Sequence, residues 1–168
     1  MRRTIPASVF RFVEVASTDA KSDVVPFWHS DSEGTPEEAM YLLAAELDVP
    51  DAAEMLEDLP AGYGVVFSIF KWEQSRAGEG FATGIENSGI ELVAEAAKSY
   101  ELVGMVEEAS ALRRVLQQHS QTPRDYSTLN TMYESEPNPY RDDWSRIPHL
   151  VRLLCTSADR YFYVDAEA

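Results

Sequence analysis

The sequence predicts a mainly α, single-domain compact helical bundle. Its 168 residues, 45% of them hydrophobic and 26% charged, are enough to bury one core. Apolar residues recur at helical spacing through most of the chain, and motifs that resemble helix caps precede several of these stretches. Internal repeats and linkers are not found in the sequence, so residues 1–168 are expected to form one α-helical domain.

Two helices are expected after residues 1–30, which have no clear period and for which no conformation is predicted. Residues 35–48 open with TPEE, which fits a capping box with proline at the first helical position, and continue with an apolar stripe. A shorter helix is expected from about Pro50 to Leu59, with acidic side chains opposite its apolar face.

The middle of the chain is expected to hold the central helix. The stretch YGVVFSIFKWEQ from Tyr63 is apolar nearly all round, and local propensity alone favours a strand. Its helix-rich neighbours favour a buried helix instead. Ser88 to Glu91 fits a second capping box before a helix that ends at Val103-Gly104, and a further helix is expected from Met105.

The last third is expected to contain two more helices. Thr122 to Asp125 fits a capping motif before YSTLNTMY, and the prolines of SEPNPYRDD indicate a loop. The apolar stretch that begins near Pro148 predicts a terminal helix, which is followed by a short aromatic segment.

Acidic residues dominate the charge balance and indicate the class of partner. The 29 acidic and 14 basic residues give a net charge of -15, which disfavours nucleic acids and anionic membranes. Eleven carboxylates lie in an acidic helical segment, residues 23–58, without a lysine or arginine among them. A basic protein is therefore the expected partner, and the alternative is that the acidity serves only solubility.

Eight carboxylates of this segment are the candidate partner-binding residues, because the two predicted helices would hold them on a fixed scaffold. They are Glu37, Glu38, Glu46, Asp48, Asp51, Glu54, Glu57 and Asp58. Four further acids could extend the row: Glu91, Glu95, Glu107 and Glu108.

Catalytic and cofactor motifs are not found. The glycines of GEGFATGIENSG, from Gly78 to Gly89, fit neither the dinucleotide-binding spacing nor a Walker A loop. The histidines at 29, 119 and 149 are isolated, no nucleophile elbow is present, and Cys155 lies in an apolar run typical of a core residue. No catalytic residue, metal ligand or cofactor is predicted, and the protein is not expected to be an enzyme.

Location follows from the apolar runs, since none is long enough to cross a bilayer and no signal peptide is recognised. A soluble cytoplasmic protein is expected.

Residues 60–118 carry a set of motif residues at a characteristic spacing. An acidic residue, Glu73, precedes the pair Gly80-Phe81, which is followed by Asn87-Ser88, a helix, the break at Val103-Gly104, and a helix that opens toward Ala109. This pattern resembles a bacterial family of unknown function that includes the DNA-mimic protein nineteen. Glu79 stands where that family usually has the first of two glycines, and Ala82-Thr83-Gly84 replaces its aromatic residues.

The resemblance implies a mainly α fold, the option of a homodimer, and structural roles for Gly80, Phe81, Asn87, Ser88 and Gly104. For the named member it implies a carboxylate surface that imitates DNA phosphates. Two alternatives stay open. One is an immunity-type or other protein-interaction module, and the other is a small-molecule or metal-binding enzyme with its site near residues 73–88, where Glu73, Gln74, Arg76 and Asn87 cluster around glycines.

Overall fold

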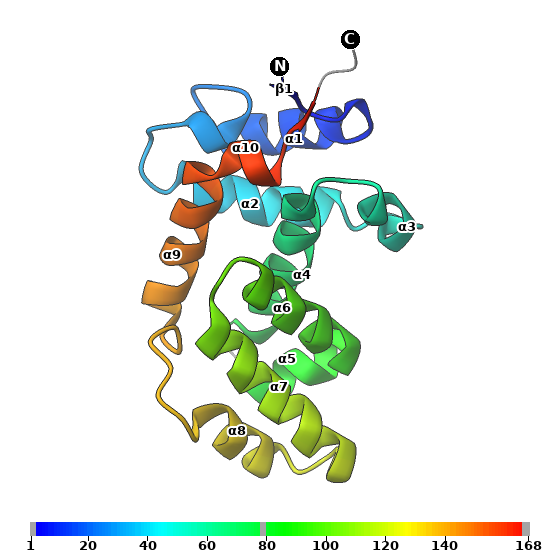
Figure 1. The fold of residues 1–168 in the computed structure, drawn as a ribbon, viewed down its shortest axis with the longest axis vertical. Helices are drawn as coiled ribbons and strands as arrows, with labels where there is room; N and C mark the ends of the chain where they lie inside the picture. The colour runs from blue at the N-terminus through cyan, green and yellow to red at the C-terminus, as the bar shows by residue number, and fades with distance from the viewer. Residues whose placement is uncertain (1–2, 78–79, 166–168) are drawn as a thin grey trace. The chain divides into compact units, whose positions relative to one another are not determined.

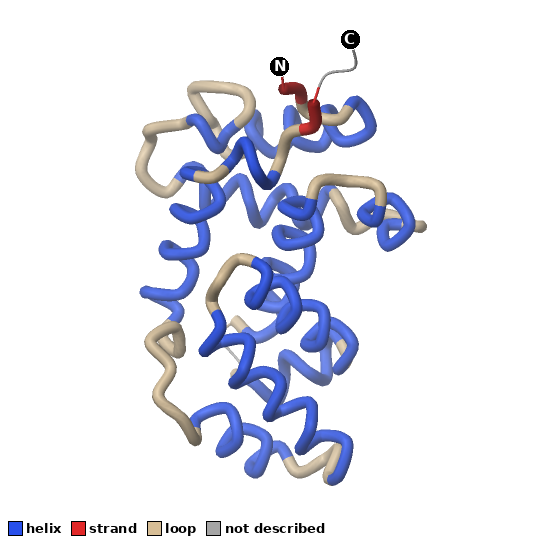
Figure 2. The backbone as a smooth tube through the Cα atoms, in the orientation of Figure 1, coloured by secondary structure: helices blue, strands red, loops and turns tan. Residues whose placement is uncertain are grey.

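The computed structural model describes residues 3–77 and 80–165, and the mainly α prediction is confirmed (Figures 1 and 2). The described residues form ten α-helices, one short 3-10 helix and a two-stranded antiparallel sheet. Within these ranges no helix combines the length and the apolar character that a membrane span requires. Contacts divide the chain into two compact units, unit 1 (Met1–Phe67 and Pro148–Ala168) and unit 2 (Ser68–Ile147).

Unit 1 contains both ends of the described chain. Its elements are β1 (Arg3–Thr4), α1 (Ala7–Asp19), η1 (Phe27–His29), α2 (Thr35–Glu46), α3 (Ala52–Glu57), α10 (Ala158–Tyr161) and β2 (Val164–Asp165). The two strands pair Arg3 with Asp165 and Thr4 with Val164.

Unit 2 contains the helices between them in sequence. These are α5 (Phe81–Ser88), α6 (Ile90–Leu102), α7 (Val106–Gln121) and α8 (Tyr126–Glu134). Two further helices, α4 (Ala61–Arg76) and α9 (Asp143–Thr156), contain the residues at which the units are divided.

The core of unit 1 combines an aliphatic layer with an aromatic cluster. Helix α1 packs against α2 and buries Val9 and Val13 completely. Trp28 stacks on Phe162 with ring centroids 4.3 Å apart. The Tyr63 hydroxyl donates to the Phe162 carbonyl at 3.1 Å, so this buried ring satisfies its polar atom.

Unit 2 is organised around α7, which packs against both α6 and α8. The turn between α6 and α7 contains Gly104 at a φ of 85°, a conformation that favours glycine because it has no Cβ. Tyr100 of α6 and Leu112 of α7 are fully buried. The predicted break at Val103-Gly104 is therefore confirmed.

Helix α4 confirms the preference for a helix over a strand at residues 63–74. Six of its apolar side chains are less than 2% exposed, which explains why its sequence has no polar face. These are Tyr63, Val65, Val66, Ile69, Phe70 and Trp72.

Two of the predicted capping boxes are wrong. Gly34, at a φ of 79°, precedes α2, and Gly89, at a φ of 80°, precedes α6, neither with a side-chain cap. The third motif caps its helix through Asp125, whose carboxylate accepts from the Thr128 N–H at 3.1 Å. Positive-φ glycines replace side-chain caps where the chain turns sharply into a helix.

The helix boundaries also differ from expectation at three places. Residues 7–19 form α1, for which no conformation was predicted. Residues 81–88 form α5, so Ser88 ends a helix, whereas the capping box at Ser88 to Glu91 predicted that it starts the next one. Helix α9 begins at Asp143, five residues before the proline that was expected to start it, and contains Pro148 in its interior.

Gly62 should tolerate no side chain. A Cβ at this position would lie 2.5 Å from the Tyr161 carbonyl oxygen and 2.8 Å from the Phe162 ring. Gly62→Ala is therefore expected to lower the free energy of unfolding by about 1–3 kcal/mol, measured by urea denaturation. Gly64→Ala is the matched control: its Cβ meets nothing within 4 Å, so it should be neutral or stabilising by about 0.5–1 kcal/mol. Equal effects of the two substitutions would contradict the packing of α4 in unit 1.

Candidate functional site

The eight candidate carboxylates all lie in unit 1, on or beside two consecutive helices. Glu37, Glu38 and Glu46 belong to α2, Glu54 and Glu57 belong to α3, and Asp48, Asp51 and Asp58 lie in the turns that flank α3. Six of the eight are exposed, while Glu37 and Glu46 are half-buried. Asp48 has a further interaction, but the side chains of the other seven make no ion pair or hydrogen bond with any residue in the described ranges. Their negative charge is therefore not neutralised locally.

Helix geometry places these carboxylates in more than one direction. Glu37 and Glu46 are nine residues apart, which is about half a turn of rotation around the axis of α2. Glu54 and Asp58 are four residues apart and share one side of α3. Helix α3 therefore presents aligned acids, whereas α2 spreads its acids around its axis.

A cavity of about 520 Å³ lies beside the start of α2 and is lined by residues of unit 1. Its acidic lining residues are Asp31, Glu33 and Glu37, and α9 adds Val151, Arg152 and Cys155. Partial burial raises the pKa of Glu37, so its carboxylate is less well solvated than an exposed one. Apolar walls with an acidic margin suit a side chain that has an apolar stem and a cationic end.

Cys155 is half-buried, and burial raises the pKa of its thiol to about 11. The thiol is therefore protonated at neutral pH and is a poor nucleophile. Cys155 lines the cavity and is not part of the buried core that its apolar run predicted.

Unit 2 contains a buried ionic network, whose centre is a bidentate pair between α4 and α9. Arg146 donates from Nε to Oε1 of Glu73 at 3.0 Å and from its Nη2 to Oε2 at 2.5 Å. Its Nη1 donates to the carbonyls of Tyr140 and Arg141 at 2.8 and 2.9 Å. The Arg146 side chain is 0% exposed and that of Glu73 is 3% exposed. The guanidinium therefore exchanges its whole hydration shell for protein oxygen atoms.

Tyr100 connects this pair to α6 by donating to Oε1 of Glu73 at 2.8 Å. Burial raises the pKa of the Tyr100 hydroxyl, and the Glu73 carboxylate raises it further. Burial lowers the pKa of Arg146, but the adjacent Glu73 outweighs this effect and the pKa is raised. Both shifts favour the protonated forms of these two groups.

Glu108 is the second buried carboxylate of the network. It accepts from the Tyr133 hydroxyl at 2.9 Å and from the Asn138 amide at 2.5 Å, and its side chain is fully buried. Burial raises its pKa, although Arg146, Asn138 and Arg76 act in the opposite direction. Glu108 therefore ties α7 to α8 and to the loop before α9, and it cannot extend an exposed acidic row as expected.

Arg76, the last residue of α4, lies between the network and the surface. Its guanidinium is 5.7, 5.8 and 5.3 Å from the ring centroids of Trp72, Phe81 and Tyr133. It donates to the Tyr133 hydroxyl at 3.4 Å, and the carboxylates of Glu73 and Glu108 lie 3.9 and 4.0 Å away. Cation–π contacts therefore hold much of this group in place.

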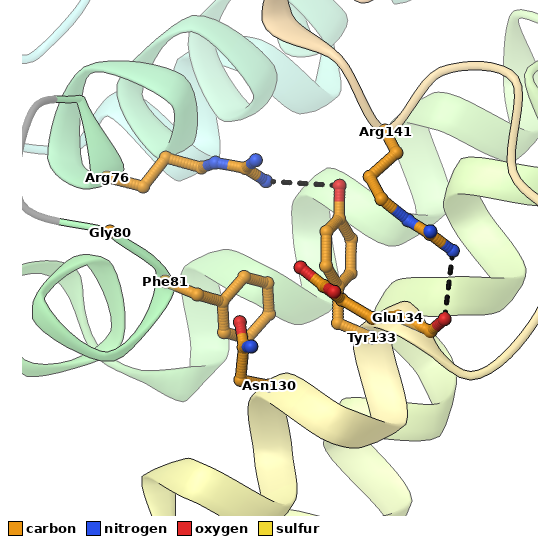
Figure 3. A pocket seen from close by; sticks show the side chains of 7 residues that line it. All are labelled: Arg76, Gly80, Phe81, Asn130, Tyr133, Glu134 and Arg141. Atoms are coloured by element: carbon orange, nitrogen blue, oxygen red, sulfur yellow. Dashed lines mark hydrogen bonds between the residues drawn. The ribbon is translucent and has the colours of Figure 1, made fainter.

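A second cavity, of about 330 Å³, opens beside Arg76 (Figure 3). Its lining comes from the end of α4, the start of α5, α8 and the loop before α9: Arg76, Gly80, Phe81, Asn130, Tyr133, Glu134 and Arg141. Arg76 reaches the Tyr133 hydroxyl, and Arg141 extends to the main chain of Glu134, to whose carbonyl it donates at 3.0 Å (Figure 3).

The structure brings together only part of the enzyme site considered near residues 73–88. Glu73 and Arg76 approach each other inside the network, whereas Gln74 and Asn87 are exposed and do not line the cavity. The sequence did not predict that Tyr100, Glu108, Tyr133 and Arg146 belong to a buried hydrogen-bonded network. Only Glu108 had a signal, because it stands three residues after Met105 and four before Leu112 on the predicted apolar face of its helix.

The histidines do not form a metal site in the part of the chain that is described. No group of three or more possible ligands occurs there. His29 contacts the Tyr163 hydroxyl at 2.8 Å, and His149 contacts Arg152 at 3.4 Å.

Most of the motif residues that suggested a family lie in turns or in the packed interior of unit 2. Gly80 has a φ of 88°, and Phe81 is buried against Trp72 and Tyr133. Ser88 donates to the Gly84 carbonyl at 2.6 Å, while Asn87 is exposed. With Gly104, these residues shape turns and packing around α5 and α6.

Comparisons with known proteins find no similarity to report. No protein-family model matches the sequence, no curated protein matches it, and no solved structure matches it. The family resemblance of residues 60–118 therefore stays a prediction from the motif residues.

Removing one partner of the Glu73–Arg146 pair should strongly destabilise unit 2. Glu73→Gln leaves the buried guanidinium without its counter-charge, and the free energy of unfolding should fall by about 3–5 kcal/mol, measured by urea denaturation. Glu101→Gln is the control, because it breaks the exposed pair with Arg113 and should have a much smaller effect. Similar losses from both substitutions would show that the buried pair is not a principal stabilising contact.

The raised pKa of Glu108 predicts a specific pH dependence. A carboxyl group whose pKa is higher in the folded state stabilises the fold below its unfolded value of about 4.5, and this contribution is lost as the pH rises through the folded value. Glu108→Gln cannot ionise, so the stability of the natural protein should fall relative to this variant as the pH rises above 4.5. Urea denaturation at a series of pH values measures this difference, with Glu107→Gln on the exposed side of α7 as control. A difference that is constant with pH would contradict the assignment.

Proposed function

We propose that this protein is a non-enzymatic, cytoplasmic binding protein whose acidic segment, residues 23–58, binds a basic protein. The observation that carries the proposal is the set of exposed carboxylates on and around α2 and α3 that have no basic residue among them. Charges left without local partners keep their full attraction for an oppositely charged surface and accelerate its association.

The cavity beside the start of α2 supports the same proposal. A lysine or arginine side chain of the partner could lay its apolar stem against Val151 and Cys155 and place its charge near Asp31, Glu33 and Glu37. A pocket that accepts one anchoring side chain is typical of protein–protein interfaces. Arg152 also lines this cavity, so the carboxylates exceed the basic residues three to one there.

A DNA-binding protein or transcription factor is the partner class that we favour, because its DNA-contacting surface is basic and is adapted to rows of negative charge. Glu54 on α3 and Asp58 at the C-terminal cap of that helix supply a short row of this kind. A competition experiment with duplex DNA distinguishes a DNA mimic from an immunity-type interaction module. A DNA mimic and duplex DNA must exclude each other from the partner, whereas another interaction module need not compete with DNA.

Neutralising the acids of α3 should weaken partner binding. A partner is first isolated from a lysate at low ionic strength, purified, and titrated against the full-length protein by calorimetry. Glu54→Gln/Asp58→Asn should weaken binding by about tenfold or more and reduce its salt dependence.

The matched control is Glu14→Gln/Asp19→Asn, which makes the same change in net charge on α1, outside the acidic segment. Equal weakening by both double substitutions would mean that only total charge matters and would contradict a defined binding surface. A partner that is not basic, or whose affinity does not change with salt, would contradict the proposal as a whole.

A further inference from the structure

The cavity in unit 2 that is lined by Arg76, Phe81, Tyr133 and Arg141 has features of a ligand site. It plays no part in the proposed binding by the acidic segment of unit 1. It lies within one compact unit and is lined by four segments of the chain. Its volume of about 330 Å³ is at the lower end of the range for small-molecule sites.

Arg141 lines this cavity and has a donor without a hydrogen-bond partner in the described ranges. It donates to the carbonyls of Glu134 and Glu136 at 3.0 and 2.5 Å, and both bonds use the same Nη2 atom. Its Nε is buried and has no acceptor in the described ranges, and it forms no ion pair with a carboxylate whose side chain is described. A half-buried guanidinium with donors left over favours an anionic ligand.

Arg76 adds a second positive charge to the lining. Its guanidinium lies 5.3 to 5.8 Å from three aromatic ring centroids, and the carboxylates of Glu73 and Glu108 lie 3.9 and 4.0 Å away. Glu108, one of those two, favours its neutral form more than an exposed glutamate does. Arg76 therefore brings a second guanidinium to the lining of the cavity.

The remaining lining residues define the rest of the ligand. Phe81 and Tyr133, with ring centroids 4.8 Å apart, provide an apolar wall. Asn130 can donate or accept a hydrogen bond. The Glu134 carboxylate would repel a second negative charge, so a monoanion fits better than a phosphate or a dicarboxylate.

We propose that this cavity binds a small molecule with one carboxylate, which lies against the Arg141 guanidinium while its apolar part contacts Phe81 and Tyr133. The site is independent of the proposed binding of a basic protein, which depends on carboxylates of unit 1.

The test is titration of the isotope-labelled full-length protein with acetate, hexanoate and 3-phenylpropionate, each paired with its neutral amide and followed by amide chemical shifts in NMR spectra. At least one carboxylate should bind with a dissociation constant at or below about 1 mM and shift resonances of Phe81, Asn130 and Tyr133. Its amide should bind at least about tenfold more weakly, because it cannot pair with a guanidinium as an anion.

Two substitutions locate the binding. Arg141→Gln should weaken it about tenfold or more, with Arg124→Gln, an exposed arginine outside the lining, as control. Since Arg141 also bonds the main chain, Asn130→Trp gives a second test: it fills the cavity from an exposed position and should abolish binding, while Thr131→Trp on the same helix should not. Failure of all three carboxylates to bind, equal binding of the amides, or full binding to Asn130→Trp would overturn the proposal.

Discussion

The buried pair between Glu73 and Arg146 is the interaction on which the rest of unit 2 depends. Two charges removed from water are stable only if nearly every donor and acceptor finds a partner. Arg146 meets this demand with two bonds to Glu73 and two to main-chain carbonyls, and Tyr100 adds a bond to the carboxylate. The pair therefore joins α4 to α9, and through Tyr100 it also fixes α6. Its bond to the Arg141 carbonyl fixes the loop before α9, which contributes Arg141 to the lining of the cavity.

Pairing of charges, more than their number, distinguishes the two parts of the chain. In unit 2 several acids are matched by arginine or lysine, as in the exposed pairs Glu101–Arg113 and Glu95–Lys98 and in the buried network. In the acidic segment of unit 1, the sequence offers no local cation to match. A net charge of -15 would not by itself indicate a binding surface. The concentration of acids in a segment that contains no lysine or arginine gives the proposed function its physical basis.

The sequence was sufficient to predict most of the helices, but it did not predict α1 or α5, several helix ends or the buried polar contacts. Helix α4 was predictable because an all-round apolar helix has few alternatives in a bundle. Residues Gly34 and Gly89 enter their helices at positive φ, which depends on the path of the whole chain and not on the motif beside them. The network joins Glu73 to a residue 73 positions later, and no local pattern specifies such a contact. The acids of the predicted partner surface could be named because exposure of charge is the default.

The geometry of Arg146 also limits how this protein can change during evolution. Its guanidinium uses three nitrogen atoms in fixed directions, and the single ammonium group of a lysine cannot reproduce that arrangement. Loss of Glu73 would leave a buried cation without its counter-charge, and loss of Arg146 would leave a buried anion. Substitution of either residue alone would therefore lower the free energy of unfolding. Surface acids can be exchanged one at a time. Distant descendants of this chain should therefore keep or lose Glu73, Tyr100 and Arg146 together, long after their acidic surfaces have diverged.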